Sequence, residues 1–373
     1  MQFTVSNNVL LKHLQSVQGA IQSNAVLPIL ENFLFQIENN TLTVSTTDLS
    51  TSMTTALQVE ATADGSITIP AKILTDTLKS LPEQGITIDF DETTSAIILT
   101  ALNAEYSFKG EEANDYPKIP TVEGGESILL SAKILSDAIN TTLFAVSTEE
   151  LRPAMTGVYF EIEADKINFV ATDAHKLVLH THTTTIDPSA TGTFIFPRKA
   201  LDLLGKALSG FSGMVTLQYN KSNVFISFDD TSLVCRLIDQ KYPNYVAVIP
   251  TEVSHTMNIN RTDFLRSLKR ISIFSNKLTS QVRLKIENDV LTMVGEDIDY
   301  AQKAHETLTC EFEDGPFEIG FNAKFLIEML ENLSSSLIKF NFSTPTRPGL
   351  MYPSETETDT STLMLVMPVM LNN

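Results

Sequence analysis

The segment Gly65-Ser66-Ile67-Thr68-Ile69-Pro70-Ala71-Lys72 recurs in altered form twice more along the 373-residue chain. Residues 192–199 read Gly-Thr-Phe-Ile-Phe-Pro-Arg-Lys, and residues 315–320 read Gly-Pro-Phe-Glu-Ile-Gly. In each copy a glycine leads an alternating strand that runs into a helix. Pro70 and Pro197 suit a helix start, because the N–H that proline lacks is not needed there. A spacing of about 125 residues indicates repeated domains and not a solenoid.

The other parts of each copy follow in the same order. A strand and an amphipathic helix open the copies at Phe3 and Val9, Ile128 and Ile134, and Met257 and Phe264. Acidic turns follow at Thr47-Asp48, Thr172-Asp173 and Glu296-Asp297, and Tyr116-Pro117 and Tyr242-Pro243 close the first two copies. We therefore predict an α+β fold of three domains, 1–124, 125–252 and 253–373, each with two helices packed on antiparallel sheets. Linkers are expected at 121–126 and 250–255.

The composition excludes several classes of protein. Hydrophobic residues make up 43% of the chain, enough for each copy to bury a core. Two distant cysteines, Cys235 and Cys310, indicate a reducing compartment and no disulfide framework. We expect no export signal at the N-terminus, and the nine apolar residues from Leu363 to Leu371 are too few to cross a bilayer. No phosphate-binding loop or Gly-x-Gly-x-x-Gly motif is present, so no nucleotide cofactor is expected.

Basic residues gather on the six expected helices, although the formal net charge is −19. The windows 6–23, 70–81, 131–147, 197–209, 260–275 and 322–334 hold twelve basic and six acidic residues. On a helical wheel most of these cations lie about 120–180° from the apolar stripe of their own helix. The apolar stripes are Leu10, Leu14, Val17 and Ile21; Leu74, Leu78 and Leu81; Leu135, Ile139, Leu143 and Val146; Leu201, Leu204 and Leu208; Phe264, Leu268 and Ile271; and Leu326, Met329, Leu330 and Leu333.

A helical surface that faces DNA explains this distribution better than ordinary solvation of exposed helix faces. Solvation is the better explanation for one helix, but six helices in a threefold repeat share the pattern. At physiological salt the Debye length is about 8 Å, so DNA near the helices would feel their cations and little of the distant acidic surface. The candidate DNA-facing residues are Lys12, Lys72, Lys79, Lys133, Arg152, Arg198, Lys199, Lys206, Arg266, Lys269, Arg270 and Lys324.

Ordered motifs along the whole chain resemble the bacterial DNA polymerase III beta subunit family, the sliding clamps. The resemblance rests on Phe3-Thr4-Val5, Leu27-Pro28-Ile29-Leu30, Thr47-Asp48-Leu49, Ala171-Thr172-Asp173-Ala174-His175-Lys176-Leu177, Phe196-Pro197-Arg198-Lys199, Tyr242-Pro243-Asn244-Tyr245, Phe274-Ser275-Asn276, Ile319-Gly320-Phe321-Asn322 and Val366-Met367-Pro368-Val369. It implies a cytoplasmic homodimer whose two chains form a ring, with twelve helices around duplex DNA. It also implies a polymerase as partner, an ATP-driven clamp loader, and neither catalysis nor a cofactor.

The resemblance further implies a pocket for short peptide motifs between the second and third domains, where polymerases, the loader and repair proteins dock. The matching positions are Thr172, His175, Leu177, Pro243, Val248, Asn322, Phe325, Val366, Met367, Pro368, Val369 and Met370. Met367 to Met370 also suit the last strand of a core, and both interpretations stay open. Tyr106, Ile273 and Phe274 match interface positions between chains, and ordinary core positions are nearly as good an explanation.

Some positions depart from the family pattern, and two other functions compete with the clamp. Arg152-Pro153-Ala154 stands where some relatives carry aromatic residues near DNA, Met370 stands where a basic residue is common, and Asn372-Asn373 extend the end. Residues 345–362 suggest a partly mobile loop. His180 and His182 share a strand face and suit zinc in principle, although strand histidines are more often surface residues. The second alternative is a scaffold that binds peptides but does not encircle DNA.

Overall fold

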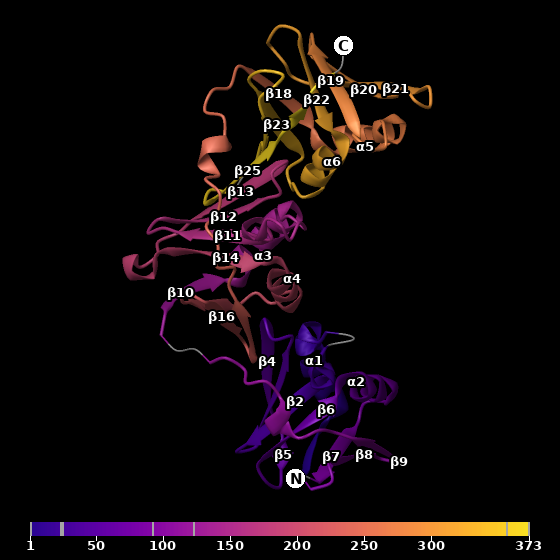
Figure 1. Ribbon diagram of the computed structural model, residues 1–373, viewed down its shortest axis with the longest axis vertical. Coiled ribbons are helices and arrows are strands. Elements are labelled where there is room, and N and C mark those ends of the chain that lie inside the picture. The colour runs from indigo at the N-terminus through magenta and orange to yellow at the C-terminus, as the bar shows by residue number, and fades with distance from the viewer. Residues whose placement is uncertain (1, 23–25, 92, 122–123, 356, 372–373) are drawn as a thin grey trace. The chain divides into compact units, whose positions relative to one another are not determined.

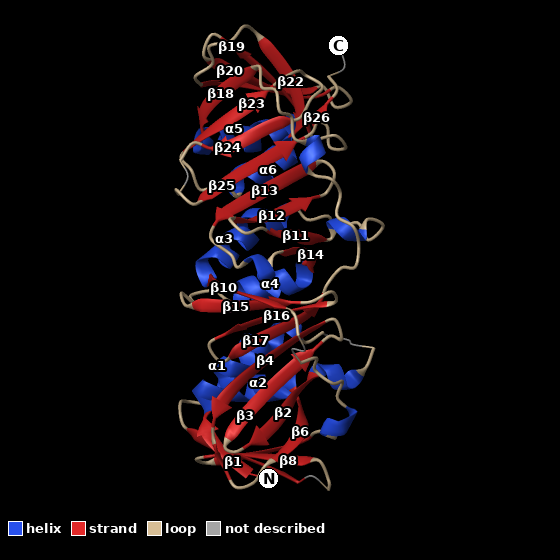
Figure 2. Cartoon of the chain, turned by 90° about the vertical axis from the view of Figure 1, so that its left-hand side faces the viewer, coloured by secondary structure: helices blue, strands red, loops and turns tan. Residues whose placement is uncertain are grey.

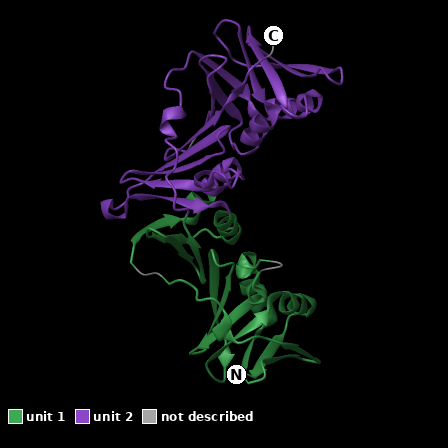
Figure 3. Cartoon of the chain, in the orientation of Figure 1, with its two compact units in different colours: residues 1–136, 199–237 green, residues 137–198, 238–373 purple. Residues whose placement is uncertain are grey.

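The computed structural model of the chain describes residues 2–22, 26–91, 93–121, 124–355 and 357–371. These residues form six α-helices and four antiparallel sheets, with the helices lying along the sheets (Figures 1 and 2). Two compact units result, 1–136 with 199–237 and 137–198 with 238–373 (Figure 3). The division runs through the central copy of the repeat, because each of the two larger sheets joins strands of neighbouring copies.

Unit 1 contains a five-stranded and an eight-stranded sheet. The smaller has the order β5 (Glu60–Ala61), β1 (Gln2–Ser6), β7 (Gly85–Asp91), β8 (Ala96–Ala101) and β9 (Ala104–Lys109). The larger has the order β10 (Glu126–Ser131), β15 (Met214–Tyr219), β16 (Asn223–Phe228), β17 (Thr231–Arg236), β4 (Thr51–Gln58), β3 (Thr41–Thr47), β2 (Asn32–Glu38) and β6 (Gly65–Pro70). β17 pairs with β4, so the first and second copies share one continuous sheet.

Unit 2 has the same pair of sheets. The larger runs β14 (Gly192–Pro197), β11 (Gly157–Ile162), β12 (Lys166–Thr172), β13 (Lys176–Thr183), β25 (Thr360–Val366), β24 (Gly349–Pro353), β23 (Leu337–Phe342) and β18 (His255–Asn260). The smaller runs β21 (Gln302–Thr309), β20 (Val290–Asp297), β19 (Gln281–Glu287), β22 (Phe317–Asn322) and β26 (Pro368–Val369). Here β13 pairs with β25, so the second and third copies share a sheet in the same way.

The six α-helices coincide with the six predicted windows but end earlier. They are α1 (Asn7–Val17), α2 (Ala71–Ser80), α3 (Ala132–Thr142), α4 (Arg198–Ala207), α5 (Arg261–Ile271) and α6 (Ala323–Glu331). Single 3-10 turns follow α1, α3 and α5 at Gln18–Ala20, Leu143–Ala145 and Ser272–Phe274. The predicted stripe residues Ile21, Leu81, Leu143, Val146, Leu208 and Leu333 therefore lie just beyond the α-helices. A tighter last turn is a common way to satisfy the last carbonyls of a helix.

The apolar stripes and alternate strand residues form the core. Leu10, Leu14, Leu74 and Leu268 have no more than 1% of their surface exposed. Leucines spaced three or four residues apart lie on one helical face, and burying each stabilises the fold by about 1.5–3 kcal/mol. Strand residues alternate in the same way, as in β1, where Phe3 is buried and its neighbours face outward.

Two segments were expected to be irregular. β24 and β25 include residues 349–353 and 360–362 of the segment 345–362, residue 356 lies outside the described residues, and a partly mobile loop there stays a prediction. Leu363, Met364, Leu365 and Val366 form a continuous apolar run, which suits a strand in the middle of a sheet. The predicted linker 121–126 includes residues 122–123, which also lie outside the described residues, as do Asn372 and Asn373.

Candidate functional site

All twelve candidate DNA-facing residues are exposed. Eleven of them lie in the six α-helices: Lys12 in α1, Lys72 and Lys79 in α2, Lys133 in α3, Arg198, Lys199 and Lys206 in α4, Arg266, Lys269 and Arg270 in α5, and Lys324 in α6. Arg152 lies in the connection before the 3-10 turn Pro153–Met155. Each helix therefore turns its leucines inward and presents at least one cation to solvent.

Several of these cations already have acidic partners. Lys206 binds Asp202 at 2.7 Å, Lys269 binds Glu331 at 2.6 Å, Arg270 binds Glu306 at 2.5 Å, Arg152 contacts Glu149 at 3.6 Å, and Lys199 pairs with Asp48. The hydrogen bond from Arg270 lowers the pKa of Glu306. Within the described residues, Lys12, Lys72, Lys79, Arg266 and Lys324 have no ion-pair partner. These five side chains are the cations most available to phosphate.

The turn between β12 and β13 positions three residues of the expected peptide pocket. Asp173 Oδ1 accepts hydrogen bonds from the backbone N–H groups of His175 and Lys176, both at 2.9 Å. Thr172 Oγ1 donates to the carbonyl of Lys176 at 2.7 Å, and Ala174 adopts a φ of 74°. The first copy repeats this turn at Asp48, with Leu49 at a φ of 76°. An aspartate that binds N–H groups two and three residues ahead explains why both copies keep a Thr-Asp pair.

Lys176 lies among these residues, although it is not one of the predicted pocket positions. Only 6% of its side chain is exposed, and its Nζ lies 2.6 Å from Asp173 and 2.9 Å from Glu328 of α6. The same Nζ lies 4.9 Å from the ring centroid of Phe325, on which His175 stacks at 5.5 Å. The Lys176 ammonium therefore lies between two carboxylates and over the Phe325 ring, and this cation–π contact stabilises the position of that ring. The sequence signal for Lys176 was its position three residues after Asp173 in the motif Thr172-Asp173-Ala174-His175-Lys176.

The C-terminal segment passes from the larger to the smaller sheet of unit 2. Val366 is fully buried and pairs with Lys176, whereas Met367 and Met370 are 41% and 72% exposed. The N–H of Met367 donates to the carbonyl of His175 at 2.9 Å, and Pro368 pairs with Phe321. Val366 is therefore a core residue, whereas the side chains of Met367, beside His175, and of Met370 are exposed.

The remaining predicted pocket residues lie in unit 2 as well. Asn322 accepts a hydrogen bond from the N–H of Lys324 and so caps α6, which carries Phe325. Leu177 is buried in the same cluster as Tyr242, next to which Pro243 is partly exposed. Val248 ends a 3-10 turn and is 51% exposed. Exposed apolar side chains around a few fixed polar groups have the composition of a peptide-binding pocket.

Of the predicted interface residues, one lies on an edge strand and two lie in a turn. Tyr106 is partly exposed on β9, the edge strand of the smaller sheet in unit 1. Ile273 and Phe274 are 71% and 39% exposed in the turn after α5. The structure adds Leu278, Ile298 and Tyr300, which are 94%, 85% and 67% exposed, to this apolar group. Large apolar side chains in turns of an acidic chain were the signal for them, since exposed apolar clusters indicate interaction surfaces.

The histidine pair of β13 is buried in the sheet. His180 and His182 are 6% and 8% exposed, so the expectation of surface histidines is wrong. They share a face of a central strand, and His180 Nδ1 lies 2.9 Å from Thr362 Oγ1 of β25. Within the part of the chain that the structure describes, no three His, Cys, Asp or Glu side chains gather as metal ligands would. The two cysteines, Cys235 and Cys310, are buried as free thiols.

A fold of repeated domains joined by shared sheets, with cationic helices, is that of the ring-building proteins of DNA replication. Family models of the DNA polymerase III beta subunit match residues 1–120 (N-terminal domain), 129–244 (central domain) and 246–369 (C-terminal domain). The chain belongs to the DNA polymerase III beta subunit family. It is accordingly a sliding clamp, a processivity factor that holds a polymerase on DNA, and not an enzyme.

Individual relatives agree along their whole lengths. The chain is 29% identical to the beta sliding clamp of Synechococcus elongatus and 28% identical to that of Vibrio cholerae, with 100% of each chain covered. It superposes on the clamp of Pseudomonas aeruginosa with a TM-score of 0.93 at 26% identity. For the Bartonella birtlesii clamp bound to griselimycin, the TM-score is 0.93 at 30% identity. Each of these two superpositions covers 100% of this chain and 100% of the other clamp. No helix in the described residues has the length and apolar character needed to cross a membrane.

Proposed function

We propose that duplex DNA passes along the cationic helical faces and is held by phosphate contacts alone. The observation that carries this proposal is the exposure of all twelve candidate cations on a chain with a net charge of −19. Contacts to phosphate carry no sequence information, and non-specific binding is weak, with a Kd on the order of 10⁻⁴–10⁻⁶ M. Weak contacts permit sliding, so an enclosing ring must supply the retention.

The strand edges indicate how a second copy closes this ring. Within the chain, the strand that follows the acidic turn of one copy pairs with the last long strand of the next copy: β4 with β17, and β13 with β25. The same rule leaves β21 of the third copy and β9 of the first without a partner in the described chain. We propose that β21 pairs with β9 of a second chain, and that β9 of the first chain pairs with β21 of the second. Two chains then close a ring in which neither β9 nor β21 remains a free sheet edge.

The internal pairs also supply the register of this junction. Leu233 lies opposite Met53 and Met364 lies opposite Val178, and all four face the core. The equivalent core-facing residues are Tyr106 on β9 and Ala304 on β21, because these pair with buried Leu99 and with Gly295 in their own sheets. Tyr106 is therefore expected opposite Ala304 of the second chain, which places Glu105 opposite His305 on the outer face.

Paired cysteines test the register. Glu105→Cys with His305→Cys places thiols on directly opposed residues of one sheet face, where oxidation should give a covalent dimer on a denaturing gel. The matched control, Glu105→Cys with Ala304→Cys, points the two thiols to opposite faces, because successive strand residues alternate. Equal cross-linking of both variants would exclude this register. Cys235 and Cys310 give little background, since both are buried.

We also propose that partner proteins insert apolar residues of short peptide motifs beside Phe325, Met367 and Met370. The griselimycin complex of the Bartonella birtlesii clamp and the polyethylene glycol bound at the putative beta-motif tethering region of the C. crescentus clamp support a ligand site on such proteins. The polymerase, an ATP-driven clamp loader and repair proteins are the proposed partners. The proposed location is the cytoplasm, where a bacterial chromosome is replicated.

Loading onto nicked circular DNA tests the whole proposal. The protein is loaded with its clamp loader and ATP, washed in high salt, and the circle is then linearised. We expect retention on the circle and release on cutting, because only topology survives the wash. Retention after cutting would indicate binding by affinity. Absence of retention with an active loader would favour the peptide-binding scaffold that does not encircle DNA.

A further inference from the structure

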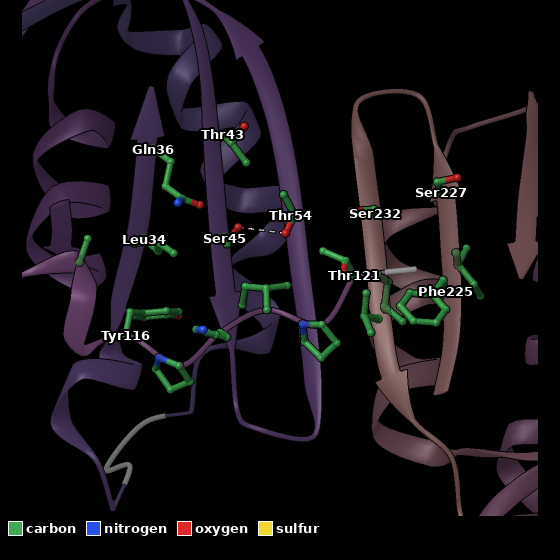
Figure 4. Close-up of a pocket in the computed structure, with 18 of the residues that line it drawn as sticks. Leu34, Gln36, Thr43, Ser45, Thr54, Tyr116, Thr121, Phe225, Ser227 and Ser232 are labelled. Atoms are coloured by element: carbon green, nitrogen blue, oxygen red, sulfur yellow. Dashed lines mark hydrogen bonds between the residues drawn. The ribbon is translucent and has the colours of Figure 1, made fainter. Parts of the chain in front are cut away.

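Unit 1 contains a cavity of about 760 Å³ on the sheet face that is turned away from its helices (Figure 4). Strands β2, β3 and β4, strands β15, β16 and β17, and the segment 113–121 surround it. Hydroxyl and amide side chains make up much of the lining, and Lys118 is its one charged residue among those described. The lining residues used below are Leu34, Gln36, Ser45, Thr54, Ile119, Ser227 and Ser232. A cavity of this size is large enough for a drug-sized ligand.

The equivalent sheet face in unit 2 is filled by apolar side chains. The strand registers make Ser45 equivalent to Val170, Thr54 to Leu179, Ser232 to Leu363 and Ser227 to Tyr352. In unit 2 those apolar side chains belong to or pack against a buried cluster under the segment that follows the second copy. In unit 1 the same positions carry small hydroxyl side chains, and the Ser45 and Thr54 hydroxyls bond each other at 3.0 Å. Smaller side chains at matched positions therefore create the cavity.

Tyrosine rings fill the equivalent space in unit 2. Tyr159 stacks on Tyr242 with ring centroids 4.6 Å apart, and Tyr245 meets Tyr159 edge-on at 6.3 Å. The Tyr245 hydroxyl donates to Glu161 Oε2 at 2.6 Å. Register and linker alignment place Leu34 and Ile119 at the positions of Tyr159 and Tyr245, and Gln36 at the position of Glu161. Unit 1 therefore keeps an acceptor for a phenol but lacks the ring.

We propose that the cavity binds a tyrosine side chain presented by a short segment of a partner protein. The ring would pack on Leu34, and its hydroxyl would donate to the side-chain carbonyl of Gln36, two residues further along β2. The volume exceeds that of one ring, and the hydroxyl and amide lining suits the backbone groups of the flanking residues. A lining with one charge favours uncharged neighbours for the tyrosine, since burying an unpaired charge is unfavourable. This cavity shares no residue with the pocket proposed for polymerase motifs.

Grafting the unit 2 residues into unit 1 provides the test. The variant Ser45→Val/Thr54→Leu/Ser227→Tyr fills the cavity with residues that the same fold already accepts in its second copy. Removing both partners of the Ser45–Thr54 hydrogen bond leaves no buried group unpaired. The probe is N-acetyl-tyrosine amide, observed by saturation-transfer NMR with the full-length protein. We expect a clear transfer signal with the parent protein and its loss with the graft.

The matched control is Thr41→Val/Gln58→Leu, which removes both partners of the 3.0 Å bond between Gln58 and Thr41 on the same sheet face, outside the cavity. This control should keep the signal, and melting curves should show both variants folded. N-acetyl-leucine amide should give a weaker signal than the tyrosine probe. An undiminished signal with the graft, or equal signals from the leucine and tyrosine probes, would overturn the proposal. Binding of free p-cresol without binding of N-acetyl-tyrosine amide would overturn the assignment to a peptide.

Discussion

Lys176 occupies a position that no other copy uses in the same way. The first copy has Thr51 there, and the third copy has a longer turn whose Asp297 accepts from the N–H of Asp299. In the second copy this position holds a cation, Lys176, which lies between Asp173 and Glu328 with 6% of its side chain exposed. A buried cation with two carboxylate partners is costly to break and orders the residues around it. The turn that carries His175 is therefore held from both sides.

Removing this charge should destabilise unit 2. We expect Lys176→Met to lower the free energy of unfolding by about 1–3 kcal/mol, because two carboxylates lose their cation in a partly buried place. Lys206→Met breaks an exposed pair with Asp202 and should change it by less than about 0.5 kcal/mol. Urea unfolding of both variants provides the comparison. Equal losses would mean that burial of Lys176 contributes nothing to stability.

The cysteine thiols should be inert in the folded protein. Burial raises the pKa of Cys235 to about 12 and that of Cys310 to about 11. A raised pKa disfavours the thiolate, which is the reactive form, so very little of either thiol is ionised at pH 8. An aromatic disulfide reagent should label neither thiol in native protein and both in guanidinium chloride. Rapid labelling of Cys235 without denaturant would contradict the burial of β17 against β4.

At the scale of helices and strands, the sequence analysis located the elements well and their ends less well. A stripe such as Leu10, Leu14 and Val17 predicts a helix because the period of 3.6 residues is unambiguous. Where the helix ends depends on tertiary contacts, and Ile21 could be placed only by the structure. Ion pairs between elements, such as Lys269 with Glu331 and Arg270 with Glu306, join residues distant in sequence. Composition alone could not separate these paired cations from free ones.

That distinction predicts which helical cations bind DNA. Replacing Lys12, Lys72 and Lys79 with glutamine removes three cations that have no acidic partner among the described residues. The slope of log K against log salt is negative, and each lost phosphate contact makes it shallower by about 0.9. Loss of three contacts should therefore reduce the magnitude of the slope by about 2–3. Anisotropy with a fluorescent duplex at low salt measures this slope. Glutamine at Lys206 and Lys269 is the matched control, and an equal effect from these paired lysines would contradict the distinction.

At the scale of the whole molecule, the repeat fixes more than any single motif does. The three copies share little identity, yet β4–β17 and β13–β25 use the same register. A sequence pattern shows that strands alternate, but it does not show which edge meets which, because pairing depends on residues far apart in the chain. The structure supplies these two internal junctions, and their common geometry supplies the expected third.

A covalently closed ring should be held by topology alone. The variant Glu105→Cys/His305→Cys, loaded in reducing buffer and then oxidised, should stay on a nicked circle in detergent, because no dissociation of the junctions can open it. Cutting the DNA or reducing the disulfides should release it. The same protein oxidised before loading should fail to load, since a sealed ring has no entrance. If the oxidised, loaded protein left an intact circle in detergent, β9 and β21 would not form the closing junction, whereas release from both cut and reduced circles would establish it.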